Sequence, residues 1–263
     1  MDPEVKLPAS VNPNVPSIAR VYDYWLGGKD NFAADREMGD RVKAVVPEMP
    51  VMAYHNRLFL RRVVRYLAGE AGIERFLDLG AGLPTMENVH EVAQKINPAA
   101  DVVYVDNDPV ALSHARALLA TTGHTHVVDG DLRRPEPVLA EADSLIGLDR
   151  PIAVLMLAML HFMQDDDAHR IVRTVMDAMP AGSYLVISHI GDSPELRKAA
   201  SFYRASGTEA VLRSPEQIAK FFDGLELVPP GVVPLPEWHP DESVPELDRM
   251  MGMAAICGVG IKR

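Results

Sequence analysis

Residues 76–84, FLDLGAGLP, constrain the fold of this chain more than any other stretch. The mostly apolar run at 76–79 is typical of a strand buried in a parallel sheet. Gly80 and Gly82 follow it, and glycine lets the backbone turn sharply and approach a ligand without a Cβ in the way. A strand, a glycine turn and then a helical pattern are typical of a nucleotide-binding loop in an α/β sheet.

Alternating apolar strands and amphipathic helices follow this loop. Two helix starts are clear, namely Asp108 before Pro109 and the capping box at 214–217. The alternation predicts a mostly parallel sheet wound by helices on both faces. We expect its strands at residues 76–79, 102–105, 126–128, 151–157, 184–188, 225–228 and 253–261.

The first 70 residues lack this alternation and are expected to be mainly helical. Four prolines within residues 1–16 suit a disordered lead-in. Ser17 suits the N-cap of a first helix, Asn31 that of a second running towards Val46, and apolar spacing predicts a third over 51–67. We therefore divide the chain into a lead-in (1–16), a helical cap or lid (17–70) and a Rossmann-like, ligand-binding domain (71–263).

Composition excludes several classes of function. The formal net charge of −11 argues against a general binder of nucleic acid or of an anionic membrane, since both need a positive field. A single cysteine, Cys257, excludes an intramolecular disulfide and a cysteine-cluster metal site, and indicates a reducing, cytoplasmic setting. The longest apolar run, 152–160, is about half the length of a membrane span. We expect a cytoplasmic protein that is not secreted and binds no metal.

Two ligand classes fit a strand, a glycine turn and a helix: dinucleotides and S-adenosylmethionine. The dinucleotide loop places a third glycine where this chain has Thr85. Asp78, two residues before Gly80, instead resembles the first motif of class I S-adenosylmethionine-dependent methyltransferases. A carboxylate attracts the sulfonium and ammonium groups of that ligand and repels a pyrophosphate.

Two further acids follow the next two expected strands. Asp106 is placed to accept hydrogen bonds from the ribose hydroxyls, and Asp131 from the adenine amino group, with the Leu132 N–H donating to the ring. Each acid also suits a loop cap or a turn, so the argument depends on the combination. The expected cofactor-binding set is Asp78, Gly80, Ala81, Gly82, Asp106, Asn107, Asp131 and Leu132.

Longer motifs carry a closer resemblance. They are SIARVYDYWLGGKDNF at 17–32, NVHE at 88–91, YVDNDP at 104–109, LHF at 160–162 and FFDGLEL at 221–227. Over about residues 17–240 the chain resembles an actinobacterial family of S-adenosylmethionine-dependent methyltransferases of uncharacterised function. The resemblance implies a class I fold of seven strands, mostly parallel with the last antiparallel, beneath an N-terminal helical cap. Trp25 and the stretch at 52–55 depart from the family pattern, so acceptor choice is expected to differ within the family.

Methyl transfer needs an aligned acceptor and, for some acceptors, a base. The acceptor is expected beyond the fourth strand, beside residues 158–162, which makes His161 the first candidate base. Tyr22 is a second catalytic candidate. Arg20, Tyr22, Tyr24, Lys29 and Asn31 are expected to close over the substrate. The alternative is a cap helix that packs on the core without touching a ligand.

We interpret the chain as an S-adenosylmethionine-dependent methyltransferase acting on a small molecule, with a link to secondary metabolism implied by the resemblance alone. The first alternative is a non-catalytic S-adenosylmethionine-binding regulatory or interaction protein, because its cofactor site would look the same. An NAD-dependent dehydrogenase and an RNA methyltransferase are weaker alternatives. No nucleic-acid or membrane partner is expected, and the sequence leaves monomer and homodimer open.

Overall fold

The computed structural model describes residues 11–119, 123–204, 208–240 and 245–263. Within these residues eight strands form one sheet in the order β3-β2-β1-β4-β5-β8-β6, with β7 paired to β8. Strands β1 to β5 are parallel, and β8 lies antiparallel between β5 and β6. The strands are Arg75–Leu79 (β1), Asp101–Asp106 (β2), Thr125–Asp129 (β3), Ala153–Leu157 (β4), Tyr184–Ile190 (β5), Glu226–Leu227 (β6), Val233–Pro234 (β7) and Ala255–Ile261 (β8).

This strand order confirms the expected class I architecture, with one strand more than the seven predicted. The additional strand, β7, lies in a proline-rich segment between β6 and β8, where we expected no strand. Strand β7 has only two residues, which is too short to show apolar alternation. One of them is proline, which has no N–H for a sheet hydrogen bond and so argues against a strand. Strand β8 begins two residues later than predicted, because the short helix α10 (Glu246–Met251) and a turn precede it.

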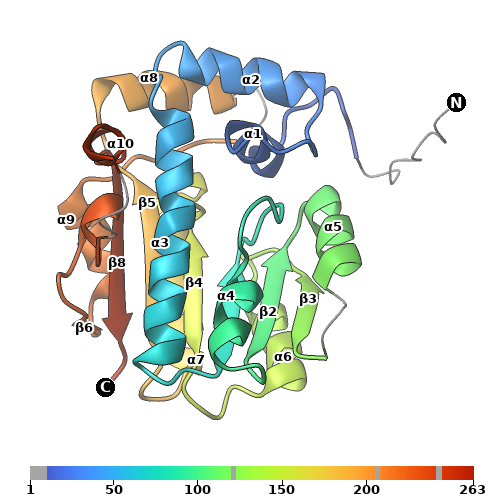
Figure 1. Cartoon of the computed structure of the whole chain (residues 1–263), viewed down its shortest axis with the longest axis vertical. Coiled ribbons are helices and arrows are strands. Elements are labelled where there is room, and N and C mark those ends of the chain that lie inside the picture. Colours follow the sequence, from blue (N-terminus) through green and yellow to red (C-terminus); the bar gives the residue numbers. More distant parts are fainter. Residues whose placement is uncertain (1–10, 120–122, 205–207, 241–244) are drawn as a thin grey trace, which may run out of the picture.

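Alternate residues of each strand face two separate helical layers. Phe76 and Leu155 pack in one core with α3 (Met49–Gly69) and α4 (Val89–Ile96), and Leu77 and Met156 pack in the other with α6 and α7. Figure 1 shows α3 and α4 side by side on the near face of the sheet. The remaining helices of these layers are α5 (Pro109–Leu119), α6 (Pro135–Ile146), α7 (Asp165–Ala178) and α9 (Pro215–Ala219).

Helix α3 belongs to the sheet rather than to a separate cap. Phe59, Val63 and Leu67 are fully buried in the same core as the strands. The division that we expected at residue 70 therefore runs through one continuous core. None of the described helices, α3 included, is both long enough and apolar enough to cross a lipid bilayer.

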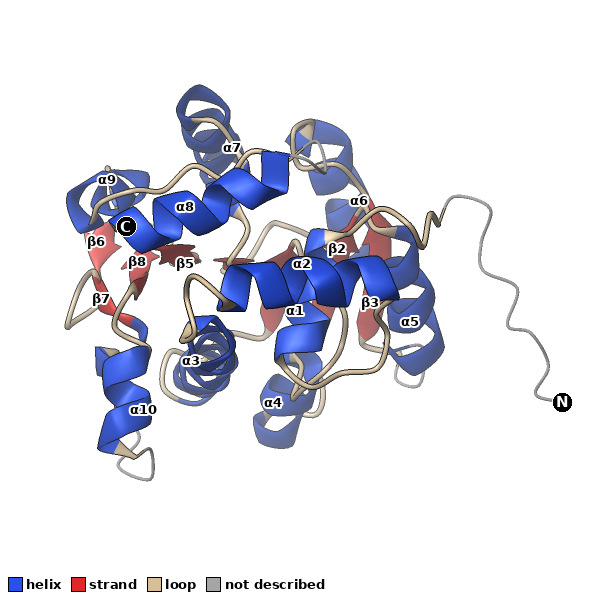
Figure 2. Ribbon diagram, turned by 90° about the horizontal axis from the view of Figure 1, so that it is seen from above, coloured by secondary structure: helices blue, strands red, loops and turns tan. Residues whose placement is uncertain are grey.

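The cap consists of three helices, α1 (Ile18–Trp25), α2 (Ala33–Lys43) and, from later in the chain, α8 (Pro194–Tyr203). It lies over the carboxyl ends of the parallel strands (Figures 1 and 2). Asn31 does not cap α2 as predicted, since Phe32 precedes the helix and its N–H donates to Asp35. Part of the expected disordered lead-in, residues 11–16, is described, and the Val15 carbonyl accepts a hydrogen bond from Arg20. Residues 1–10 lie outside the described part of the chain.

Candidate functional site

A cleft of about 510 Å³ lies between the carboxyl ends of the strands and the cap. Its walls come from the glycine loop after β1, the ends of β2, β4 and β5, the first turns of α3, and the helices α1 and α8. Ligands of open α/β sheets bind at this edge, where the strand order reverses between β1 and β4.

The glycine loop forms one wall of the cleft and depends on glycine at two positions. Gly80 and Gly82 have φ of 80° and 66°, in the left-handed region that favours glycine. A Cβ on Gly80 would lie 3.2 Å from the Cβ of Met159, whereas a Cβ on Gly82 would face open space. The N–H groups of Gly80 and Ala81 donate to the Val105 carbonyl and fix the loop against β2. A ligand can therefore approach the backbone at Gly82.

Asp78 is a buried carboxylate to which no described residue donates a hydrogen bond. Burial raises its pKa to about 7; the nearby Asp106 adds to the shift and Arg57 opposes it. A buried charge without a partner is unfavourable, so such groups are normally paired. Because Asp78 lines the cleft, a bound cation would be its partner.

Asp106 is held in place by the backbone around it. Its Oδ2 accepts from the Gly82 N–H (2.7 Å), and its Oδ1 accepts from the N–H groups of Asn107 and Asp108 (2.8 Å each). Burial raises its pKa although these bonds oppose the shift. Three of about four acceptor positions are thus used, which leaves room for one further donor, whereas we expected two ribose hydroxyls.

Asp131 and Leu132 line the cleft where β3 ends, and Asp131 is already paired. The Arg133 Nε donates to its Oδ1 (2.9 Å), and this hydrogen bond lowers the pKa of Asp131. The Arg133 side chain is two-thirds exposed, so the pair is weak and a ligand can displace it. All eight residues expected to bind the cofactor line this one cleft.

His161 lies in the short helical turn Leu160–Phe162 after β4 and lines the same cleft. Its Nδ1 is buried and has no hydrogen-bond partner among the described residues. Burial holds its pKa well below the usual range, and the neighbouring His189 and Arg213 add to the shift. The imidazole is therefore neutral at physiological pH, although the same burial opposes its protonation.

Arg213 fixes the loop that carries His161 and also binds His189, and sequence reasoning missed both residues. The Arg213 guanidinium donates to the carbonyls of Leu160 (3.0 Å) and Met163 (2.9 Å), to His189 Nε2 (2.8 Å) and to Asp165 (2.9 Å). Two of these bonds flank His161 along the chain. No spacing in the sequence links Arg213 to residues 160–163, because only the folding of β5 and α8 brings them together.

A buried polar network joins the cap to the ends of β4 and β5. Tyr22 Oη donates to the Ala53 carbonyl (3.0 Å) and accepts from Asn56 Nδ2 (2.9 Å), while Ser188 Oγ donates to Asn56 Oδ1 (2.6 Å). Ser188 Oγ also accepts from the N–H of Ala158, which has an unusual positive φ of 53°. Burial raises the pKa of Tyr22. Its hydroxyl lines the cleft but is engaged in positioning, which does not suit the catalytic role we expected.

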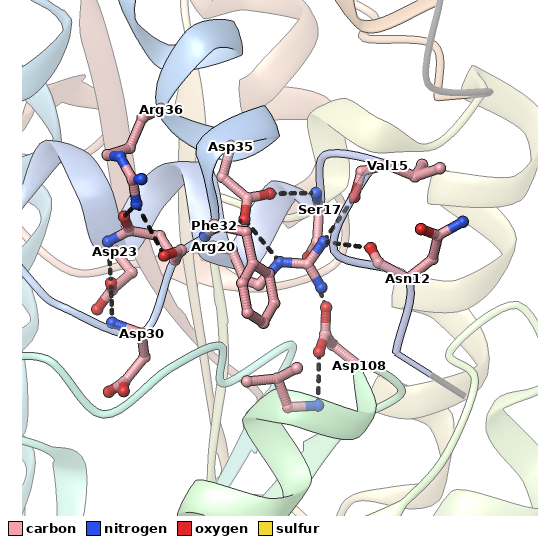
Figure 3. A network of polar contacts seen from close by, with 12 residues as sticks. Asn12, Val15, Ser17, Arg20, Asp23, Asp30, Phe32, Asp35, Arg36 and Asp108 are labelled. Carbon is pink, nitrogen blue, oxygen red and sulfur yellow. Dashed lines mark hydrogen bonds and ion pairs between the residues drawn. The ribbon is translucent and has the colours of Figure 1, made fainter. Parts of the chain in front are cut away.

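The other residues expected to close over the substrate do not line the cleft. Arg20 pairs with Asp35 at 2.9 Å inside the cap, as Figure 3 shows. The Tyr24 hydroxyl donates to Asp40, and Lys29 is exposed. Asn31 donates to Asp23. Arg20, Tyr24 and Asn31 thus hold the cap together, which agrees with the alternative of a packed cap helix.

Asp23 and Ser17 connect the cap to the cofactor side of the cleft. Asp23 Oδ1 accepts from the hydroxyl of Thr85 (2.8 Å), in the glycine loop, and Ser17 donates to Asp108 at the start of α5. A Cβ on Gly28 would lie 1.9 Å from Asp23 Oδ1, so any other residue there would displace the Asp23 carboxylate. Thr85, which replaces the third glycine of the dinucleotide loop, thus has a structural role as a contact of the cap.

The cleft combines an unpaired carboxylate, a glycine loop open to a ligand and a neutral imidazole. These groups suit a nucleoside that carries positive charge and lies along the loop. No cluster of three or more histidine, cysteine or acidic side chains that could hold a metal ion occurs among the described residues.

Comparisons with known proteins agree with this geometry. A solved protein from Thermobifida fusca YX, described as a candidate methyltransferase, is 44% identical, with a TM-score of 0.92 over 98% of this chain and 99% of that one. A DUF574 family protein from Streptomyces avermitilis MA-4680 is 40% identical, with a TM-score of 0.88 over 95% and 98% of the two chains. An O-methyltransferase family protein from Burkholderia thailandensis, 15% identical over 81% and 59% with a TM-score of 0.53, shares the fold alone.

No curated protein matches the chain. The sequence profile of the S-adenosyl methyltransferase family matches residues 4–263. With this match and the two close structural relatives, the chain belongs to the S-adenosyl methyltransferase family.

Proposed function

We propose that this protein transfers a methyl group from S-adenosylmethionine to a small molecule, with His161 as the proton acceptor. The observation that supports this most strongly is the shared cleft: unpaired Asp78 and neutral His161 line one cavity from two neighbouring strand ends. Methylation of a protonated nucleophile needs a group that holds the cationic methyl donor and a base that takes the proton of the acceptor. Asp78 and His161 lie where they could fill these two roles.

The methyl donor is proposed to lie along the glycine loop. Asp78 would pair with its ammonium group, the open face of Gly82 would allow close approach, and the remaining acceptor position of Asp106 would take a ribose hydroxyl. Bound there, S-adenosylmethionine supplies a methyl group on a positively charged sulfur, which leaves as a neutral sulfide when a nucleophile attacks.

His161 would act on the acceptor. As the acceptor oxygen forms its new bond to carbon and the C–S bond breaks, the hydroxyl proton passes to the His161 imidazole. Arg213 holds the loop on both sides of His161, so the ring stays beside the cleft, and burial keeps it uncharged. The cap above the strand ends limits the cleft to a small acceptor.

Calorimetry with S-adenosylhomocysteine and with NAD tests the donor side. We expect micromolar binding of the first and none of the second, and tight binding of NAD alone would overturn the proposal. Transfer of labelled methyl groups into the small-molecule fraction of a cell extract tests catalysis, with His161→Gln as the inactive control. Binding without transfer to any small molecule or polymer would favour a regulatory protein instead.

A further inference from the structure

The half of the cleft farthest from the glycine loop is built differently from the donor half. Its walls come from α1, the start of α3, the turn after β4, and α8. Most of its side chains are apolar or aromatic. They include Trp25, Met49, Met52, Phe162, Leu196 and Tyr203.

Aromatic rings and methionines suit a flat, apolar ligand. The Phe162 ring lies 5.7 Å from the Tyr203 ring, edge to face, and 4.3 Å from the His161 ring. Met49 and Met52 are buried, and methionine sulfur makes favourable contacts with aromatic rings. A pocket of this kind recognises ring systems mainly by contact area, with a few polar groups fixing the orientation.

Charge is nearly absent from this half. Among the described residues that line it, Glu209 is the one acidic side chain, and at the rim it accepts a hydrogen bond from Gln164 and pairs with the exposed Arg204. Two arginines line the cleft. Arg57 binds backbone carbonyls of the loop after β1 through Nη2, while its Nε is buried without a partner among the described residues, and Arg133 binds Asp131. An anionic ligand away from Arg57 would lose its hydration here with little compensation.

The polar groups of this half leave one position for a reacting group. Tyr22, Asn56 and Ser188 bind one another, and His189 is bound by Arg213. His161 lines the cleft at the boundary with the donor half, and its Nδ1, unpartnered among the described residues, is buried on the side away from the accessible surface. A ligand therefore meets the His161 ring at one end and apolar surface along the rest.

From this arrangement we infer the substrate class, resting on the proposed methyl transfer: the acceptor is an uncharged aromatic small molecule whose hydroxyl group faces His161. Phosphorylated, carboxylated and polymeric acceptors do not fit this half of the cleft. The hydroxyl oxygen receives the methyl group and its proton moves to His161, as described above.

A matched pair of ligands tests this class by binding alone. With the protein saturated by S-adenosylhomocysteine, calorimetry compares 2-naphthol with 6-hydroxy-2-naphthoate, which adds one carboxylate. We expect 2-naphthol to bind at least about tenfold more tightly, because the carboxylate would be buried without a partner. Equal or tighter binding of the carboxylated compound, or no binding of either, would overturn the inference.

A charge placed in the pocket should reverse this preference. Ala200 lines the cleft from α8, and the next residue, Ser201, points to solvent. We expect Ala200→Lys to shift the affinity ratio by about tenfold towards 6-hydroxy-2-naphthoate, and Ser201→Lys to leave it unchanged. If the affinity ratio of the two ligands is unchanged in Ala200→Lys while S-adenosylhomocysteine still binds, the ligands do not bind in the apolar half of the cleft, and the inference is wrong.

The two proposals fail in different ways. If 2-naphthol binds as expected but receives no methyl group, the pocket remains and the transferase function fails. If labelled methyl groups enter only anionic or polymeric acceptors, the function remains and the substrate class fails.

Discussion

The two halves of the cleft differ in how the chain builds them. The donor half consists of residues at or just after the carboxyl ends of three neighbouring strands, and its acids, Asp78 in β1, Asp106 at the end of β2 and Asp131 after β3, keep the order of those strands. The acceptor half consists of side chains from segments far apart, such as Asn56 and Ser188, which are 132 residues apart in sequence and in contact through a hydrogen bond. The first half is defined by the strand ends of a common fold, and the second by side chains from distant segments of the chain.

The halves also differ in charge. The donor half holds carboxylates whose pKa burial raises, as in Asp78 and Asp106, while the acceptor half holds a histidine whose pKa burial lowers. Burial acts in the same way on both, by opposing the charged form, but with opposite results for acids and bases. A bound cation would favour the ionised form of Asp78, whereas no described acidic group in the acceptor half lies where it would favour the protonated form of His161.

The largest expected effect of a single change is at the boundary between the halves. His161→Gln should lower kcat by about 10²- to 10⁴-fold, because the proton acceptor is lost while the shape is nearly kept. Affinity for S-adenosylhomocysteine should stay within about twofold. The exposed His124→Gln serves as the matched control, measured by the same kinetics and calorimetry. A parallel loss of cofactor affinity would show that the halves are not separate.

A change in the donor half should have opposite effects on binding and on stability. Asp78→Asn should weaken S-adenosylhomocysteine binding by at least about tenfold, since a charged hydrogen-bond acceptor is lost. The folded pKa of Asp78, about 7, exceeds the ordinary value of 3.8, so the folded protein binds more protons and loses stability as pH rises through this window.

Removing that charge should therefore raise the Tm of the ligand-free protein by several degrees at pH 7.5, as measured by calorimetry. Asp129→Asn, at an exposed strand end outside the cleft, is the control. A lower Tm in Asp78→Asn would contradict the claim that this buried carboxylate has no partner in the ligand-free protein.

A smaller effect is expected where the cap meets the glycine loop. Thr85→Val removes one hydrogen bond to Asp23, which keeps its bonds from Asp30 and Asn31, so the free energy of unfolding should fall by about 1 kcal/mol. Because the cap carries part of the acceptor half, KM for the acceptor should rise a few-fold while cofactor affinity is unchanged. Denaturant titration and steady-state kinetics measure both, and a cofactor-only defect would contradict this division.

The smallest effect is expected from mild acid. Because burial lowers the pKa of His161, its neutral form persists below pH 6.5, so kcat should change by less than about twofold between pH 8 and 6. Unfolded histidine binds a proton near pH 6.5, so stability should fall as pH drops below that value. A steep loss of kcat near pH 6.5, without unfolding, would mean that His161 is not in this environment.

Most of the donor half could be predicted from the sequence because its signals are local. A strand, two glycines and an acid lie within a few residues, and the strand alternation orders the acids that follow. Helix α6, which begins with Pro135, was missed since its first turn resembles a loop, and β7 was missed because it is only two residues long. The pairing of Asp131 with Arg133 depends on side-chain geometry that spacing does not determine.

Much of the acceptor half could not be predicted. His161 was placed correctly beside the cleft because it follows a strand. Tyr24 and Asn31 were expected to contact the substrate, yet the Tyr24 hydroxyl donates to Asp40 and the Asn31 amide to the nearby Gly28 carbonyl, so both are used within the cap. Arg213 and Asn56 had no local signal, since their partners lie in distant segments.

A crystal structure with bound S-adenosylhomocysteine would test the division of the cleft most directly. We predict the ligand along Gly80 to Gly82, with its ammonium group within hydrogen-bond distance of Asp78, a ribose hydroxyl on Asp106, and its sulfur facing His161 and the apolar half. A ligand in the reverse orientation, or one whose sulfur points away from His161, would contradict the account.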